Sequence, residues 1–139
     1  FDKEESQSYN IQLLPGAITD FFETQNDTLS YKYNTKALAD FGNLNLTITN
    51  IDQFPVIVEL VDSKGKVESS IYQTQGRTFS FKLVRPGEYF VRLIYDVNEN
   101  GVWDTGRFLE GRKPEPVLYD ATPIEIRANW DVQLSISLY

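Results

Sequence analysis

The sequence predicts an all-β protein, an antiparallel β-sandwich of about seven strands that is preceded by a separate two-stranded piece. Apolar and polar residues alternate in short segments along most of the chain, which is the pattern of half-buried strands. Aromatic residues make up 14% of the sequence, mainly Tyr and Phe, and these residue types favour strands. No segment has the apolar periodicity of a helix of three turns. At 139 residues, the chain can build one substantial core.

The N-terminal part divides into a polar leader, residues 1–8, and a two-stranded region, residues 9–39. Strands are expected near 9–13 and 29–33, joined by a connection that begins with the turn Pro15-Gly16. The segment 37–41 is too short for a stable helix and predicts a crossover turn. Alternation places one apolar face on the two strands, formed by Ile11, Leu13, Leu29, Tyr31 and Tyr33.

Residues 40–139 carry the strand signals of the sandwich itself. The expected strands lie at 44–48, 56–61, 67–72, 79–83, 89–95, 117–119, 124–126 and 130–138. Because successive side chains of a strand point to opposite faces, four residues are expected inside the sandwich: Val91, Leu93, Leu134 and Ile136. The charged segment 110–116, which contains Pro114 and Pro116, is predicted to be an exposed excursion.

Composition excludes several classes of function. The chain has no Cys and no His, which removes disulfides, thiolate chemistry and His-based catalytic triads. Its formal net charge of −7 argues against nucleic acid as a partner. It has no run of about 18 apolar residues that could cross a membrane. Since it starts at Phe1 and contains no Met, we expect a processed or excised part of a longer protein.

The segment after Tyr95 has the spacing of a calcium-binding loop. Oxygen-bearing side chains occupy relative positions 1, 3, 5 and 9, and Gly101 occupies position 6. The predicted ligands are Asp96, Asn98, Asn100, the carbonyl of Val102, and Asp104. Position 12, which is a bidentate Glu in complete loops, is Arg107, and the nearest spare carboxylate is Glu110. The alternative is a solvated hairpin loop in which Asn and Gly supply the positive φ angles.

Other chemistry has weaker support in the sequence. Asp96, Asp104 and Glu110 could be considered as a glycosidase carboxylate pair, but such pairs usually come from separate elements that line a cleft, so no enzyme is predicted. Trp103 and Trp130 are candidate ligand contacts, because a flat ring can stack on sugars or on a partner protein. The alternative is that Trp103 covers the edge of the core and Trp130 packs at the start of the last strand.

Two stretches resemble known families. The segment YNIQLLPGAITDFFETQNDTLSYKYNT, residues 9–35, resembles the last two strands of the bacterial Ig-like domain of surface-layer proteins. Residues 40–139 resemble the C-terminal module of Ig-like-domain lipoproteins of Bacteroidetes. The motifs that carry this second resemblance are ADFGNLNLTITN, RPGEYFVRLIYDVNENGVWDTG, KPEPVLY and IEIRANWD.

The resemblance implies an Ig-like or prealbumin-like sandwich, of the transthyretin or collagen-binding-B type, behind the remnant of another Ig-like domain. It also implies a multi-domain lipoprotein of the cell envelope, anchored to the outer membrane on its periplasmic or surface-exposed side. Collagen-binding-B domains often carry an isopeptide crosslink that needs a Glu where this chain has Leu93, so no crosslink is expected.

We therefore expect a non-catalytic spacer or interaction module, with calcium as the one cofactor considered. Its expected partners are upstream Ig-like domains of the same chain, an envelope protein or a glycan, and a second copy through residues 9–35. The alternative function is a carbohydrate- or protein-binding module. A buried Trp103 would favour the spacer, and an exposed aromatic cluster beside Asp96 would favour the binding module.

Overall fold

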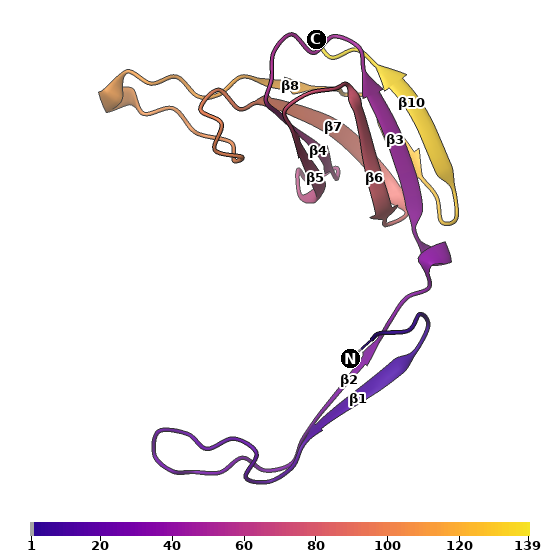
Figure 1. Ribbon diagram of the computed structural model, residues 1–139, viewed down its shortest axis with the longest axis vertical. Helices are drawn as coiled ribbons and strands as arrows, with labels where there is room; N and C mark the ends of the chain where they lie inside the picture. The colour runs from indigo at the N-terminus through magenta and orange to yellow at the C-terminus, as the bar shows by residue number, and fades with distance from the viewer. Residues whose placement is uncertain (1) are drawn as a thin grey trace. The chain divides into compact units, whose positions relative to one another are not determined.

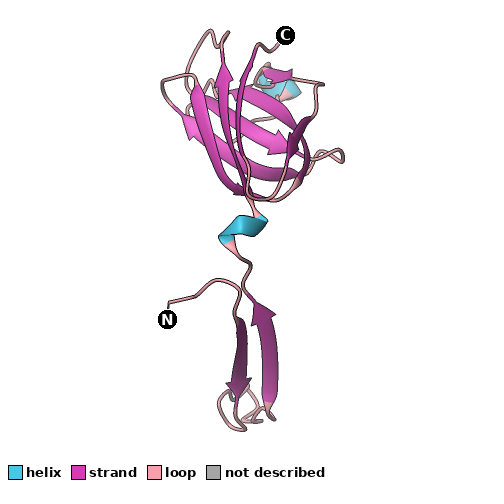
Figure 2. Ribbon diagram, turned by 90° about the vertical axis from the view of Figure 1, so that its right-hand side faces the viewer, coloured by secondary structure: helices cyan, strands magenta, loops and turns pink. Residues whose placement is uncertain are grey.

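The computed structural model describes residues 2–139, which form two compact units, one ending at Leu38 and the other spanning Ala39–Tyr139 (Figure 1). Strands are the main elements of both units (Figure 2). The helical elements of the described chain are two single turns of 3-10 helix, η1 (Leu38–Asp40) and η2 (Phe108–Glu110). None of its helices has the length and apolar character that crossing a bilayer requires. The first turn lies where the sequence predicts a crossover turn.

The first unit is an antiparallel hairpin of β1 (Ser8–Leu13) and β2 (Leu29–Asn34). The register pairs Tyr9 with Tyr33 and Leu13 with Leu29, so the predicted apolar residues lie on one face and the polar residues on the other. The rings of Tyr9 and Tyr33 stack with their centroids 5.1 Å apart. Tyr31 is nevertheless 57% exposed, so much of this apolar face is open to solvent.

The second unit is a β-sandwich of eight strands, where the sequence predicted about seven. One sheet has the strand order β10-β3-β6, and the other has the order β5-β4-β7-β8 with β9 also paired to β7 (Figure 1). The strands are β3 (Gly42–Ile48), β4 (Val56–Val61), β5 (Val67–Gln73), β6 (Thr78–Val84), β7 (Gly87–Tyr95), β8 (Val117–Tyr119), β9 (Ile124–Ile126) and β10 (Asp131–Ile136).

One strand pair departs from the antiparallel pattern that the sequence predicts. β10 pairs with β3 in parallel, with Val132 opposite Leu44 and Ile136 opposite Ile48. Side chains fasten this pair at both ends: Asn43 Nδ2 donates to Asp131 Oδ1 at 2.7 Å, and Leu138 N donates to Asn50 Oδ1 at 2.9 Å. The last strand of the module is therefore joined directly to its first strand.

The core lies between the two sheets, and the predicted strand register is confirmed. Val91 and Leu93 of β7 are fully buried, and they belong to one cluster with Leu44 and Leu46 of β3. Leu134 and Ile136 pack against this cluster but are only half-buried, because β10 is an edge strand. Period-2 alternation was thus sufficient to assign the inner face of each of these strands.

Candidate calcium loop between β7 and β8

Asp96 follows β7 directly and organises the backbone of the candidate loop. Its side chain is 1% exposed, and its two carboxylate oxygens accept hydrogen bonds from Asn100 N at 3.2 Å and Gly101 N at 2.7 Å. Gly101 has a φ of 78°, in the left-handed region that favours glycine. The chain therefore curls around the Asp96 carboxylate, as expected for the first position of a cation-binding loop.

Asp104 brings the other predicted ligand side chains together. Asp104 Oδ2 accepts hydrogen bonds from the side-chain amides of Asn98 and Asn100, the latter at 2.6 Å. These two bonds, the one from Asn98 first, lower the pKa of the Asp104 carboxyl from its ordinary value because they stabilise the charged form. Three of the predicted ligands thus meet around one carboxylate oxygen.

The two amides present nitrogen to Asp104, whereas a calcium ion requires oxygen. Asn98 Oδ1 accepts a hydrogen bond from Asn100 N at 3.2 Å, and Asn100 Oδ1 accepts one from Val102 N at 2.9 Å. Within residues 2–139, no three acidic side chains gather closely enough to hold a metal ion. The donor set fits calcium only if the amides turn so that their oxygens join Asp96, Asp104 and the Val102 carbonyl.

Glu115 is a member of this site that sequence reasoning missed. It is 8% exposed, although it lies in the segment predicted to be an exposed excursion, so that prediction is wrong at this residue. Its Oε1 accepts hydrogen bonds from Val97 N at 2.9 Å and Asn98 N at 3.4 Å, and its Oε2 accepts one from Asp104 N at 3.0 Å. The Glu115 carboxylate therefore ties both ends of the loop together from a later segment of the chain.

Glu110, the spare carboxylate singled out from the sequence, lies apart from this arrangement. It forms an exposed ion pair with Arg107 at 2.9 Å in the turn around η2. The sequence feature that could have pointed to Glu115 is its place between Pro114 and Pro116, since two prolines favour an extended segment just before β8. The backbone of this segment also meets the end of β7, because Tyr95 N donates to Pro116 O at 3.0 Å.

The two tryptophans are both solvent-accessible. Trp103 is 47% exposed, and its indole N–H donates to the carbonyl of Glu115 at 3.4 Å. Trp130 is 56% exposed, so the expectation that it packs at the start of β10 is wrong; the Arg127 guanidinium instead lies 5.1 Å from its ring centroid. Of the two, only Trp103 belongs to the loop around Asp96.

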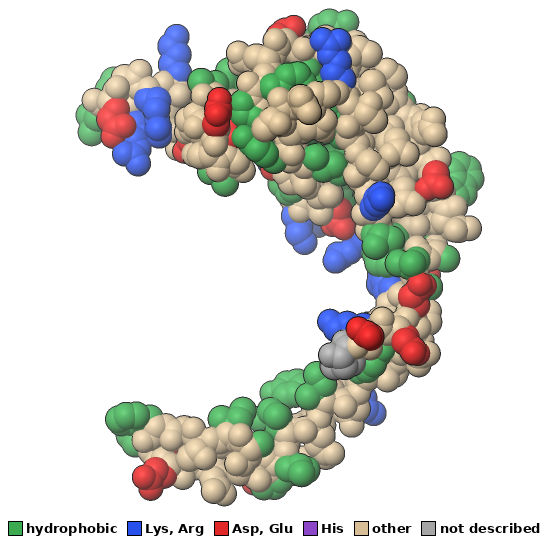
Figure 3. Space-filling view, viewed as in Figure 1, with side chains coloured by type: hydrophobic (Ala, Val, Ile, Leu, Met, Phe, Trp, Pro, Cys, Tyr) green, Lys and Arg blue, Asp and Glu red, His purple; other side chains and the backbone are tan. Residues whose placement is uncertain are grey.

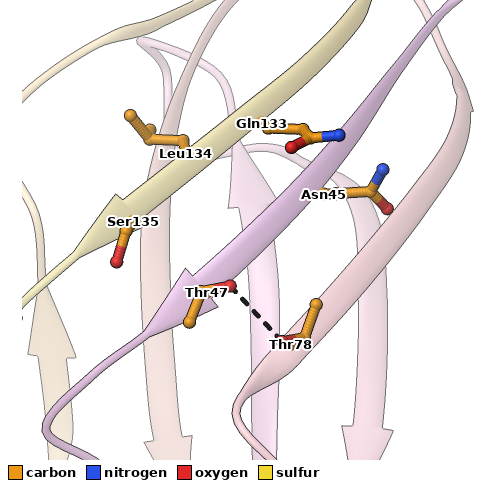
Figure 4. Close-up of a pocket in the computed structure, with 6 residues that line it drawn as sticks. All are labelled: Asn45, Thr47, Thr78, Gln133, Leu134 and Ser135. Carbon is orange, nitrogen blue, oxygen red and sulfur yellow. Dashed lines mark hydrogen bonds between the residues drawn. The ribbon is translucent and has the colours of Figure 1, made fainter.

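The described residues form several surface cavities, two of which differ in their chemistry. One, of about 310 Å³, lies between the Asp96 loop and the 112–116 segment, and its walls include Val97, Pro114 and Pro116. The other, of about 440 Å³, is a wide depression on the β10-β3-β6 sheet (Figure 4). Thr47 and Thr78 share a hydrogen bond there at 3.3 Å, and the residues that line it are uncharged. The second cavity therefore offers no acid, base or metal ligand of high charge.

No family model, curated protein or solved structure matches this chain.

Proposed function

We propose that the second unit is a non-catalytic structural or interaction module of the cell envelope, a spacer within a multi-domain surface lipoprotein, whose β7–β8 loop binds one calcium ion. The observation that carries the proposal is the closed loop from Asp96 to Asp104. Its first carboxylate is buried beneath backbone N–H groups, and its last carboxylate gathers the amides of Asn98 and Asn100. This arrangement places oxygen-rich side chains together at the end of β7.

The proposed ligands are Asp96, Asn98, Asn100, the carbonyl of Val102, and Asp104. Bound calcium would supply positive charge that holds the two aspartates and the amide oxygens in place. Glu115 would hold the loop in shape, because its carboxylate accepts backbone N–H groups from both ends of the loop. The expected consequence is a stiffer end of the sandwich, which suits a spacer.

A non-catalytic role agrees with the chemistry available. The chain lacks Cys and His. The carboxylates of Asp96 and Glu115 are buried and occupied by backbone donors, and Glu110 is paired with Arg107, so none of the three is poised as a free acid or base.

Calcium binding is tested by thermal melting and tryptophan fluorescence in calcium and in chelator. At a calcium concentration a hundredfold above the dissociation constant, stability should rise by about 2.7 kcal/mol. Asp104→Asn should reduce this increase, whereas the matched control Glu110→Gln should leave it unchanged. Equal melting temperatures of the wild-type protein in millimolar calcium and in chelator would refute calcium binding.

A binding module for a carbohydrate or a protein is the second candidate, and one observation favours it. Trp103 is not buried, and Val97 and Val102 of the same loop are 67% and 58% exposed. The exposed Trp103 is one part of the exposed aromatic cluster that the binding alternative expects, and the two valines are aliphatic. Trp103→Ala should then abolish glycan or partner binding that Trp130→Ala leaves intact, and a lack of binding by the wild-type protein to glycan arrays and envelope extracts would count against it.

The hairpin of the first unit is proposed to lie against upstream Ig-like domains of the same protein. Its apolar face, which includes Ile11 and Tyr31, resembles the inner face of a sandwich sheet that lacks its opposing sheet. When this chain is isolated, we expect a second copy to cover that face or to pair with the open edges of the hairpin.

A further inference from the structure

The β7–β8 connection carries an apolar tip that the calcium proposal does not use. Phe108 and Leu109 lie side by side in η2 and are 97% and 98% exposed. In Figure 1 this short turn, drawn in orange, stands at the far end of the connection, away from the sheets. Isolated apolar residues on a surface are ordinary, but two adjacent side chains with almost no protein contact form an apolar point available to a partner.

The tip is held on a closed backbone turn. Arg107 N donates to Arg112 O at 2.9 Å, and Arg112 N donates to Arg107 O at 3.1 Å, so two hydrogen bonds close the base of the turn. Gly111 has a φ of 64°, and its N–H donates to Phe108 O at 3.1 Å. This hydrogen-bonded turn presents Phe108 and Leu109 together.

Positive charge lies directly behind the tip. Residues 105–114 contain three basic side chains and one acidic side chain, although the whole chain has a net charge of −7. Glu110 pairs with Arg107, so Arg112 and Lys113 are the two basic side chains of this segment outside that ion pair, and the acids Asp104 and Glu115 lie at the base of the connection beyond them. In Figure 3 the end of this connection shows Lys and Arg atoms next to hydrophobic ones.

We propose that this tip docks on an anionic lipid surface. Phe108 and Leu109 would enter the boundary between headgroups and acyl chains, and Arg112 and Lys113 would lie at the level of the lipid phosphates. The turn has apolar side chains at its apex and cationic side chains behind them, and an anionic bilayer has an apolar interior beneath negatively charged headgroups. An acidic protein groove would match the charge alone, so the lipid surface is the partner that fits both features.

The binding is weak and reversible, because two apolar side chains and two cations are a small anchor. It suits a protein that a second attachment already holds near a membrane. The docking does not depend on calcium, since none of the four side chains belongs to the proposed ion ligands.

The experiment is vesicle flotation of the full chain in chelator, with vesicles of phosphatidylcholine alone or of equal parts phosphatidylcholine and phosphatidylglycerol. The protein should float with the anionic vesicles only. Phe108→Ser with Leu109→Ser should abolish flotation, and Arg112→Ala with Lys113→Ala should weaken binding roughly fivefold for each charge removed. Circular dichroism would verify that these exposed substitutions leave the fold intact.

The first unit supplies a matched control. Phe21 and Phe22 are also adjacent and are 95% and 82% exposed, but their neighbours are Asp20 and Glu23 rather than basic residues. Phe21→Ser with Phe22→Ser should leave flotation unchanged if the charged context matters.

Three results would overturn the proposal. The first is a lack of flotation of the wild-type protein with anionic vesicles. The second is flotation that the double substitution at Phe108 and Leu109 leaves unchanged, or that the control at Phe21 and Phe22 removes equally. The third is a dimer in light scattering that the substitutions at Phe108 and Leu109 dissolve, because a second copy would then be what covers the tip.

Discussion

Replacing Glu115 by Ala should loosen the whole loop between β7 and β8. The side chain is buried, and it accepts hydrogen bonds from Val97 N at 2.9 Å and Asp104 N at 3.0 Å, with a longer one from Asn98 N at 3.4 Å. The substitution removes the acceptor for backbone donors at both ends of the loop. The indole of Trp103 donates to the backbone carbonyl of the same residue, so it lies next to the site of the substitution.

The expected loss follows from the two shorter bonds. A hydrogen bond to a charged acceptor contributes about 1.5–3 kcal/mol, so two of them give an upper bound of about 6 kcal/mol. Water can reach the freed donor at the exposed Val97 and recover part of this energy. The expected decrease in the free energy of unfolding is therefore about 2–4 kcal/mol. Glu115→Gln, which keeps one acceptor oxygen, should lie between Ala and the wild-type residue.

Urea unfolding followed by tryptophan fluorescence measures the global effect, and hydrogen exchange at the amides of Val97 and Asp104 measures the local one. Glu110→Ala is the matched control, because its ion pair with Arg107 is exposed and should contribute only about 0–1 kcal/mol. The reasoning would be refuted if Glu115→Ala changed stability by less than about 0.5 kcal/mol and left the exchange of both amides unchanged.

Three further outcomes are expected. Leu93→Ala should lower the free energy of unfolding by about 2–5 kcal/mol because the side chain is fully buried, and a denaturation midpoint equal to that of the wild type would contradict this. The pKa of Asp104 is lower in the folded state than the unfolded value of 3.8, so the stability that its charged form contributes is present above pH 3.8 and is lost as the pH falls through the folded pKa. The side-chain amide NMR signals of Asn98 and Asn100 should therefore move only in that acidic range. Light scattering should find the full chain self-associated and a shortened chain, residues 39–139, monomeric with an intact cooperative melt; a monomeric full chain, or a shortened chain that fails to fold, would show that the prediction is wrong.

The strands could be predicted from the sequence because side-chain alternation is a local property. The inner positions of β7, such as Val91 and Leu93, follow from that alternation alone. Which strands become neighbours is not a local property, so the parallel pairing of β10 with β3 could not be predicted from the residues of either strand. The eight segments expected between residues 44 and 138, which include the short strands β8 and β9, are all strands in the structure, so only the approximate number of seven was too low.

The candidate site was predictable only as far as its residues are contiguous. The spacing from Asp96 to Asp104 marked the loop, and the structure brings Asn98 and Asn100 to Asp104. Glu115 could not be found from a linear motif, because the turn that contains η2 separates it in sequence from the other residues of the loop. Trp130 was misjudged because a strand start can also be an exposed edge, where Arg127 covers the ring.

The parallel ladder between β3 and β10 has a mechanical consequence for a protein proposed to act as a spacer. The chain enters the ladder at Asn43 and leaves it at Ile136, which lie at opposite ends of the paired strands. Tension applied through the two ends of the module would therefore act along the strands and load all the inter-strand hydrogen bonds together. The side-chain bonds of Asn43 with Asp131, and of Asn50 with Leu138, resist the same sliding movement at either end. A sandwich pulled in this direction has to rupture by shear instead of opening one bond at a time.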